Sequence, residues 1–215
     1  MATLYEELAE YTDAPVELVE LRCQGAGAEL AWLWRQGFHE SATEFYASTD
    51  LYIFDLTFYQ TMLKQHGAHE GFGHLFPRPG VKVLDFGGGI GEWTIVAAKK
   101  GCEATYLDVH DSETMEYAQW RFAKHGVKPR ILTDLDGPPD EPFDLIVAMD
   151  VFEHLEEPQP LVERFARQAR YLLCNPKEIK YNFLFPQHIS HYELEPHWKH
   201  VEHYLWESTA SGREG

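Results

Sequence analysis

The sequence predicts an α/β fold in which a parallel sheet, covered by helices on both faces, follows a helical amino-terminal cap. From residue 81 onward, short apolar runs alternate with helical stretches, and this alternation is typical of βαβ units and hence of a parallel sheet. The residues before that point carry helical patterns without a β-rich run. Directly after the first apolar run, four glycines occupy the five positions 87–91, which indicates a tight turn between a strand and a helix.

Residues 1–76 are predicted to form the helical cap, which would act as a lid over a site in the sheet domain. A capping-box pattern lies at 41–44, and the stretch 32–59 is rich in aromatic residues. We expect most of these rings in the core of the cap itself. The rings that we expect to reach a substrate are Tyr46, Tyr52 and Tyr59.

The sheet domain is expected over residues 77–207, after a proline-containing boundary at 76–80 and before a flexible tail at 208–215. Its expected strands are 81–86, 102–109, 129–134, 143–149 and 170–175, and its expected helices are 92–100, 112–126 and 160–169. Two further strands are expected at 180–185 and 200–207. Because this last segment is short for a closing hairpin, we expect the final strands to be truncated or completed by a partner chain.

The composition restricts the class of partner. With 18 basic and 35 acidic residues, the formal net charge is -17, and a surface this acidic repels the phosphates of nucleic acids. The first residues lack a basic leader followed by an apolar block, and no run of roughly 18 apolar residues is present. We therefore expect a cytoplasmic protein that does not enter a membrane. The three cysteines are far apart and are expected to be free thiols.

Glycines at the carboxyl end of the first strand let a ligand lie against bare backbone, facing the amino end of the next helix. A dinucleotide fingerprint, G-x-G-x-x-G, requires a third glycine. Counted from Gly87 that position is Glu92, and counted from Gly89 it is Thr94. A carboxylate at the helix entrance would also repel a pyrophosphate. The loop therefore favours a cofactor without phosphate.

The stretch V-L-D-F-G-G-G-I-G, residues 83–91, resembles the first motif of class I S-adenosylmethionine-dependent methyltransferases, V-L-D-x-G-x-G-x-G. The stretch F-D-L-I-V-A-M-D-V-F-E-H-L, residues 143–155, is similar to a later motif of the same family. The resemblance extends over roughly residues 75–175. It implies a Rossmann-like sheet and S-adenosylmethionine as the cofactor.

The resemblance also implies roles for individual residues. Asp108, at the end of the second strand, would accept hydrogen bonds from both ribose hydroxyls, and Val109 would pack beside the adenine. Asp134, for which Asp136 is a rival, would contact the adenine amino group, and Asp150 would border the methionine end. The residues implied for the cofactor site are Asp85, Phe86, Gly87, Gly88, Gly89, Gly91, Asp108, Val109, Asp134, Leu135, Met149 and Asp150.

Histidines are the candidates for proton transfer. Methyl transfer from a sulfonium is an in-line displacement, so the protein mainly positions the nucleophile and removes a proton where the nucleophile carries one. Five of the twelve histidines lie near the carboxyl end, and His188 and His191 are the candidate bases. Two other interpretations stay open: a metal ion shared by this pair or by His197 and His200, and purely structural roles. We expect no metal, and a structural role for His154.

Together these features predict an S-adenosylmethionine-dependent methyltransferase that acts on a small molecule, at oxygen or nitrogen. Two alternatives remain. One is a binding or scaffold protein that keeps the fold without turnover, and the other is a methyltransferase that acts on a protein or nucleic acid. The methyl acceptor is open at this point, as is the oligomeric state, for which a homo-oligomer is one option.

Overall fold

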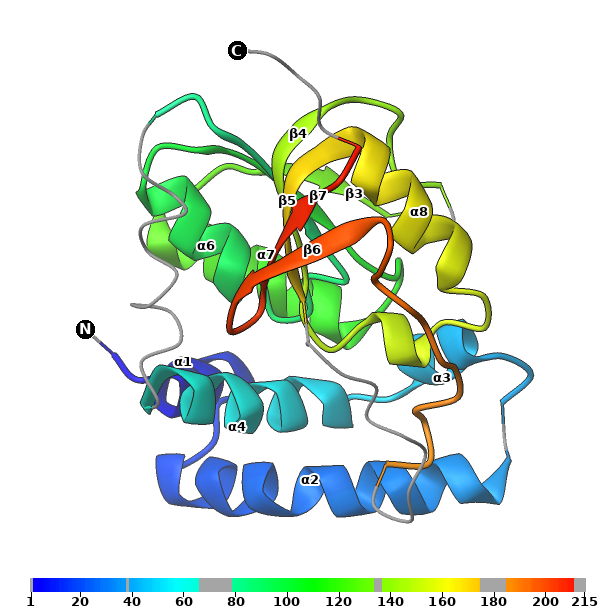
Figure 1. Ribbon diagram of the computed structural model, residues 1–215. Helices are drawn as coiled ribbons and strands as arrows, with labels where there is room; N and C mark the ends of the chain where they lie inside the picture. Colours follow the sequence, from blue (N-terminus) through cyan, green and yellow to red (C-terminus); the bar gives the residue numbers. More distant parts are fainter. Residues whose placement is uncertain (1, 38, 66–78, 134–136, 175–184, 211–215) are drawn as a thin grey trace.

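The computed structural model describes residues 2–37, 39–65, 79–133, 137–174 and 185–210. Its centre is a seven-stranded sheet with the strand order β3-β2-β1-β4-β5-β7-β6 (Figure 1). Strands β1 to β5 pair in parallel, whereas β7 is antiparallel to both of its neighbours, β5 and β6. The strands are β1 (Lys82–Phe86), β2 (Glu103–Leu107), β3 (Arg130–Leu132), β4 (Phe143–Ala148), β5 (Ala169–Cys174), β6 (Trp198–Glu202) and β7 (Leu205–Ser208).

Helices cover both faces of this sheet, as predicted. They are α6 (Glu92–Lys99) and α7 (Glu113–His125) on one face, and α8 (Gln159–Gln168) on the other (Figure 1). Side chains alternate between the faces along each strand, so that Val83 packs in the cluster that contains α6 residues and Leu84 in the cluster that contains α8 residues. A 3-10 turn, η2 (Phe152–His154), follows β4.

The expectation of truncated or partner-completed final strands is wrong. The chain itself supplies the closing hairpin, because β6 and β7 are joined at His203 and Tyr204, and β7 lies beside β5. The expected single strand at 200–207 is therefore two strands with a tight turn between them. His203 supports this turn with a φ of 44°. The strand expected at 180–185 falls almost wholly outside the described residues.

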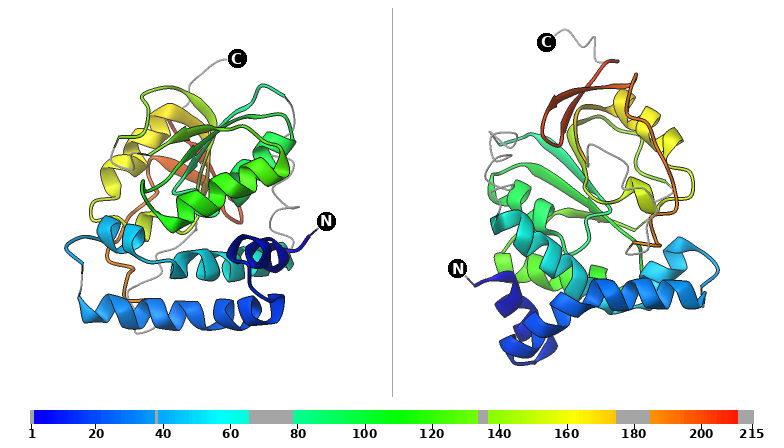
Figure 2. Two further views of the ribbon diagram at one scale, coloured as in Figure 1. Left: turned by 180° about the vertical axis from the view of Figure 1, so that it is seen from behind. Right: turned by 60° about the horizontal axis from the view of Figure 1, so that its bottom comes forward.

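The described residues before the sheet are mainly helical, as predicted. Its helices are α1 (Leu4–Thr12), α2 (Val16–Gln36), α3 (Ala42–Ser48) and α4 (Leu51–Gln65), which we call the helical cap. The cap at Ser41 is confirmed, since its hydroxyl accepts a hydrogen bond from the Glu44 amide at 3.1 Å. The Glu44 carboxylate accepts from the amide of Glu40, so the reciprocal bond of the expected capping box goes to a different residue. Figures 1 and 2 show α4 lying between α2 and the sheet domain.

A buried ion network fixes the cap to the sheet domain. The Arg121 guanidinium of α7 donates to Glu7 of α1 at 2.9 Å and to Glu92 of α6 at 2.6 Å. It also donates to the carbonyl of Ile90 at 2.6 Å. The exposed fractions of the three charged side chains are 1%, 4% and 5%, so these charges are compensated within the protein and not by water.

The domain limits remain predictions, because the segment between α4 and β1 lies mostly outside the described residues. Ser208, the first residue of the expected tail, is the last residue of β7, and its hydroxyl donates to the Ala166 carbonyl. Among the helices that the structure describes, none is both long and apolar enough to cross a bilayer.

Candidate functional site

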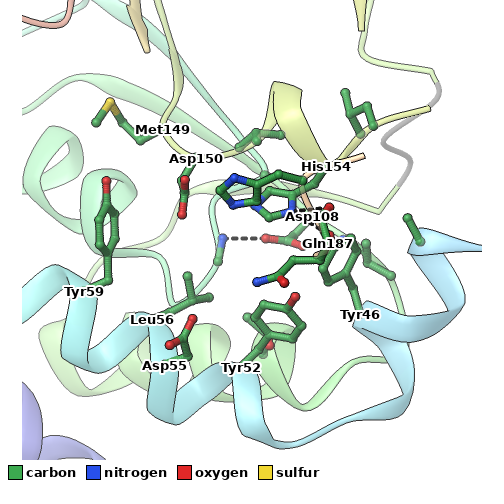
Figure 3. A pocket seen from close by; sticks show the side chains of 18 of the residues that line it. Tyr46, Tyr52, Asp55, Leu56, Tyr59, Asp108, Met149, Asp150, His154 and Gln187 are labelled. Carbon is green, nitrogen blue, oxygen red and sulfur yellow. Dashed lines mark hydrogen bonds between the residues drawn. The ribbon is translucent and has the colours of Figure 1, made fainter. Parts of the chain in front are cut away.

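A cavity of about 1180 Å³ lies between the helical cap and the edge of the sheet where the parallel strands end (Figure 3). Its walls come from α2, α3 and α4, from the loops after β1, β2 and β4, and from residues 185–188. Ligand pockets commonly have volumes of about 300–1,000 Å³, so this cavity has room for a cofactor together with a small second molecule. Its position agrees with the general rule that open α/β sheets bind ligands beyond the carboxyl ends of their strands.

The loop after β1 requires glycine at the two positions that line the cavity. Gly87 and Gly89 have φ values of 64° and 53°, in the left-handed region that disfavours other residues. A Cβ atom at Gly87 would lie 2.6 Å from a methyl of Val151, and one at Gly89 would lie 2.9 Å from a methyl of Leu56. The bare backbone therefore keeps this wall of the cavity open.

Asp108 follows β2 and faces the same wall. One of its carboxylate oxygens accepts a hydrogen bond from the Val109 amide at 2.7 Å, and the other accepts from the Gly89 amide (Figure 3). Burial raises the pKa of Asp108 to about 6. An ionised carboxylate can accept about four hydrogen bonds. Each oxygen thus keeps acceptor capacity for hydroxyl donors in the cavity, and this set of groups fits a ribose.

Four of the residues implied for the cofactor site do not line the large cavity. Asp85 accepts from the backbone amide and the hydroxyl of Thr94, at 2.9 and 2.6 Å, and so ties β1 to α6. Phe86 is fully buried in the core, and a Cβ at Gly91 would lie 2.5 Å from the ring of Phe122. Gly88 and Asp85 border a small adjoining void of about 20 Å³. These four residues are therefore placed to support the conformation of the loop after β1.

Val109, Met149 and Asp150, also implied for the cofactor site, line the cavity. Asp150 lies two residues after the end of β4 and has a φ of 60°, a left-handed conformation that is uncommon for a residue other than glycine. Backbone conformations of this kind cluster at functional sites. Asp134 and Leu135, together with the rival Asp136, lie outside the described residues.

The three tyrosines predicted to reach a substrate all line the cavity. Tyr46 comes from α3, whereas Tyr52 and Tyr59 come from α4. The rings of Tyr46 and Tyr52 are in edge contact, with centroids 4.9 Å apart. Figure 3 shows Tyr46 and Tyr52 near His154, and Tyr59 nearer Met149. Aromatic side chains of the cap thus face the loop after β4 across the cavity.

His154 lies in the cavity wall, although the sequence suggested only a structural role. Its Nδ1 atom lies 2.7 Å from the Tyr46 hydroxyl and 3.2 Å from the Gln187 carbonyl (Figure 3). Burial lowers the pKa of His154 to about 4, so the imidazole is neutral at physiological pH. Its ring contacts that of His188, with centroids 4.7 Å apart. The signal in the sequence was the position of His154, six residues after the end of β4 at Ala148.

The carboxyl-terminal histidines do not gather at one place. His188 is buried and lines the cavity, whereas His191 is exposed and does not line it. His197 lies 3.6 Å from Glu163, and His200, exposed on β6, lies 3.0 Å from the carbonyl of His203. Neither of the histidine pairs considered for a metal therefore forms a site within the described residues.

Asp55 is a cavity residue that the sequence analysis missed. It lies on α4, and burial together with the charge of Asp150 raises the pKa of its carboxyl group to about 6. The absence of a side chain at Gly27 of α2 makes room for it, because a Cβ there would lie 2.9 Å from Asp55 Oδ1. A lone acid inside the aromatic-rich stretch 51–59 was the available signal.

Comparison with known proteins supports the interpretation of the motifs. A family model described as a methyltransferase domain matches residues 60–178, more than half of the chain. The chain is also 42% identical over 73 residues to the ribosomal protein L11 methyltransferase of Thermus thermophilus. That match covers 33% of this chain and 28% of the relative.

Similar solved structures include the magnesium protoporphyrin IX methyltransferase ChlM of Synechocystis PCC 6803 with bound SAH, at 21% identity and a TM-score of 0.47. The likeness covers 66% of this chain and 64% of that one. A SAM-dependent methyltransferase of Aquifex aeolicus is 26% identical, with a TM-score of 0.42, over 49% of this chain and 62% of that one. The chain thus spans less than two thirds of the length of each of these three relatives.

Proposed function

We propose that this chain, which belongs to the class I S-adenosylmethionine-dependent methyltransferases, transfers a methyl group to a small organic acceptor, at oxygen or nitrogen. One observation carries the proposal. The glycine loop and Asp108 share a single cavity with Asp150 and with the tyrosines of the helical cap. A cofactor bound against the loop would therefore have a second molecule beside it, enclosed by helices.

In this proposal Asp108 holds the ribose through the acceptor capacity that its two oxygens retain. Gly87 and Gly89 let the cofactor lie against the backbone, and Met149 and Asp150 border its methionine end. Asp134 and Leu135 remain the proposed contacts of the adenine. S-adenosylmethionine would supply an electrophilic methyl group, and the chain would supply position and proton transfer.

Two kinds of proton acceptor face the acceptor side of the cavity. One is imidazole, from His154 and His188, and the other is the carboxylate of Asp55. A general base works best when its pKa lies near the operating pH, which favours Asp55, with its pKa of about 6, over His154. His191, exposed and outside the cavity lining, has no part in this proposal.

A small acceptor is favoured because the cap covers the strand ends, where an open groove would be needed for a macromolecule. The net charge of -17 argues against a nucleic acid. A protein acceptor is the second candidate, and the local identity to the ribosomal protein L11 methyltransferase favours it. A substrate protein would have to present a side chain through the mouth of this cavity.

The first experiment is calorimetric titration of the purified protein with S-adenosylmethionine, S-adenosylhomocysteine and, as a control, NAD. We expect one site for the first two ligands and none for NAD. A panel of phenols, amines, small acids and ribosomal protein would then be tested for release of S-adenosylhomocysteine. Binding of NAD with no binding of S-adenosylhomocysteine would contradict the proposal. Methylation of the ribosomal protein and of none of the small molecules would favour the second candidate.

A further inference from the structure

We propose that Asp150, His154 and His188 bind one divalent transition-metal ion at the acceptor end of the cavity. Binding of the ion is a property of these three side chains and does not depend on methyl transfer. Its role for the acceptor, described below, rests on the function proposed above.

The three side chains are close enough to share an ion. One carboxylate oxygen of Asp150 and one nitrogen from each imidazole lie within 4.8 Å of one another. Metal–ligand bonds of about 2.1 Å bring the atoms around an ion to about 3 to 4 Å from each other. Small rotations of the three side chains would therefore be sufficient to close the set. All three residues also line the cavity, so an ion can reach them from solvent.

The orientation of His154 suits a metal ligand. Nδ1 lies 3.2 Å from the Gln187 carbonyl, which can only accept a hydrogen bond, and 2.7 Å from the Tyr46 hydroxyl, which can donate or accept. In the tautomer that the site requires, Nδ1 carries the proton and both oxygens accept from it. The lone pair of the neutral ring is then on Nε2, where it is available to a metal. Metal-binding histidines almost always donate their other N–H in this way, and the donation fixes both the tautomer and the plane of the ring.

The donor set selects a class of metal. Two imidazoles and one carboxylate suit Mn²⁺, Fe²⁺, Co²⁺ and Zn²⁺, whereas Mg²⁺ and Ca²⁺ prefer sets made of oxygen atoms. Three protein ligands leave further coordination positions open, which is typical of sites where a substrate binds to the metal. The site is thus built for a transition ion that also contacts a small molecule in the cavity.

The charge of the cavity favours a cation at this place. Asp55 of the cap faces Asp150 across the cavity (Figure 3), and the two carboxyl groups repel each other when both are ionised. Asp108, Glu156 and Glu157 also line this cavity, and Arg164 is the basic side chain that the lining includes beside them. A divalent ion between the imidazoles and Asp150 would offset this repulsion and would allow an acceptor with an anionic oxygen to enter.

If the proposed function holds, the ion would hold an acceptor through the atom that binds it, for example the oxygen of a phenol or of a hydroxy acid. Both imidazole lone pairs would be occupied by the metal. Asp55 would then be the group that takes the acceptor proton.

The test is calorimetric titration of the full chain, first treated with a chelator, with Zn²⁺, Mn²⁺, Co²⁺ and Mg²⁺ as separate probes. We expect one transition ion per chain and much weaker binding of Mg²⁺. His188→Ala and His154→Ala should each weaken Zn²⁺ binding at least tenfold. His191→Ala, three residues away and exposed, and His200→Ala on β6 are the matched controls and should leave it unchanged.

Because substitution of a buried histidine can impair folding, a second measurement uses wild-type protein. Co²⁺ bound by two imidazoles and a carboxylate should give visible absorption bands, and His191→Ala should keep them. No binding by wild-type protein, or equal binding by His188→Ala, would overturn the metal site. Titration with S-adenosylhomocysteine in the presence of a chelator separates the two proposals. If the protein binds this ligand but wild-type protein binds no metal ion, the proposed function is retained and the metal site is refuted.

Discussion

The helical cap meets the sheet domain at two interfaces of opposite character. At one end, apolar residues of α1, α2 and α4, among them Leu8, Val19 and Ile53, form one cluster with Ile90 and Tyr117 of the sheet domain, and the Arg121 ion network lies beside it. At the other end, α3 and the tyrosines of α4 face a cavity of about 1180 Å³.

The two interfaces therefore differ in role: the first stabilises the fold, and the second binds ligands. The first interface buries charges that satisfy one another, so loss of one member should destabilise the fold. The second interface holds polar groups directed at open space, which a ligand can satisfy. Changes at the first interface should therefore alter the free energy of unfolding, and changes at the second should alter binding and rate.

The largest expected effect is that of Asp55→Asn at the cavity interface. If Asp55 accepts the acceptor proton, its loss should lower kcat by about 10²- to 10⁴-fold, the usual contribution of a general base. In wild-type protein kcat/KM should fall below pH about 6, because the carboxyl group becomes protonated there. The variant should lack this acid limb. The check is a pH–rate profile with a turned-over acceptor, with Asp50→Asn, an exposed acid of the same cap, as the control.

Asp55 also makes a prediction about stability that needs no acceptor. A carboxyl group whose pKa is raised in the folded state favours folding below its unfolded pKa, and this contribution is lost as the pH rises through about 6. Relative to Asp55→Asn, wild-type protein should therefore be less stable at pH 7.5 than at pH 5. Thermal unfolding of metal-free wild-type and Asp55→Asn protein at both pH values measures the difference in stability between them. The same difference at pH 5 and at pH 7.5 would contradict a raised pKa for Asp55.

The next largest effect is expected at the first interface, which contains the Arg121 ion network. Arg121→Met should lower the free energy of unfolding by about 3–5 kcal/mol, because it leaves Glu7 and Glu92 buried without the guanidinium. The imidazole of His125, 2.9 Å from Glu7, would still face one of the two carboxylates. Arg22→Met, which breaks an exposed pair with Asp50, should cost less than about 1 kcal/mol. Urea unfolding of both variants measures the contrast.

A smaller effect is expected at the cofactor wall. Asp108→Ala should weaken S-adenosylmethionine binding by about 1.5–3 kcal/mol, the range for hydrogen bonds to a charged group. Its free energy of unfolding should not fall by as much, because the removed carboxyl group is buried with a raised pKa. Glu103→Ala, at the exposed other end of β2, is the matched control. Unchanged affinity in Asp108→Ala would remove this residue from the cofactor site.

The two walls of the cavity differ in how far the sequence reveals them. The cofactor wall comes from a loop and a strand end that are local in sequence, so the glycines after β1 could be recognised from their spacing, and the acid after β2 from the resemblance to the methyltransferase motifs. The acceptor wall joins α3, α4, η2 and the residues around His188 from distant parts of the chain. His154 and Asp55 became visible as cavity residues only through this tertiary convergence. Likewise, the β6–β7 hairpin was missed because a turn at His203 and Tyr204 carries no glycine or proline.

The smallest effect should come from Tyr46→Phe, which removes one of two groups at Nδ1 of His154. The Gln187 carbonyl would still accept from Nδ1, so the ring should keep its tautomer, but its orientation would be less restricted. A neutral hydrogen bond contributes about 0.5–1.5 kcal/mol. Zn²⁺ affinity should therefore fall by about 2- to 10-fold, while S-adenosylhomocysteine affinity stays unchanged.

Tyr59→Phe removes a hydroxyl from the same cavity at a position away from His154 (Figure 3), so calorimetry should show no change in its Zn²⁺ affinity. Equal losses in both variants would mean that the cavity responds to its overall polarity and not to the orientation of His154.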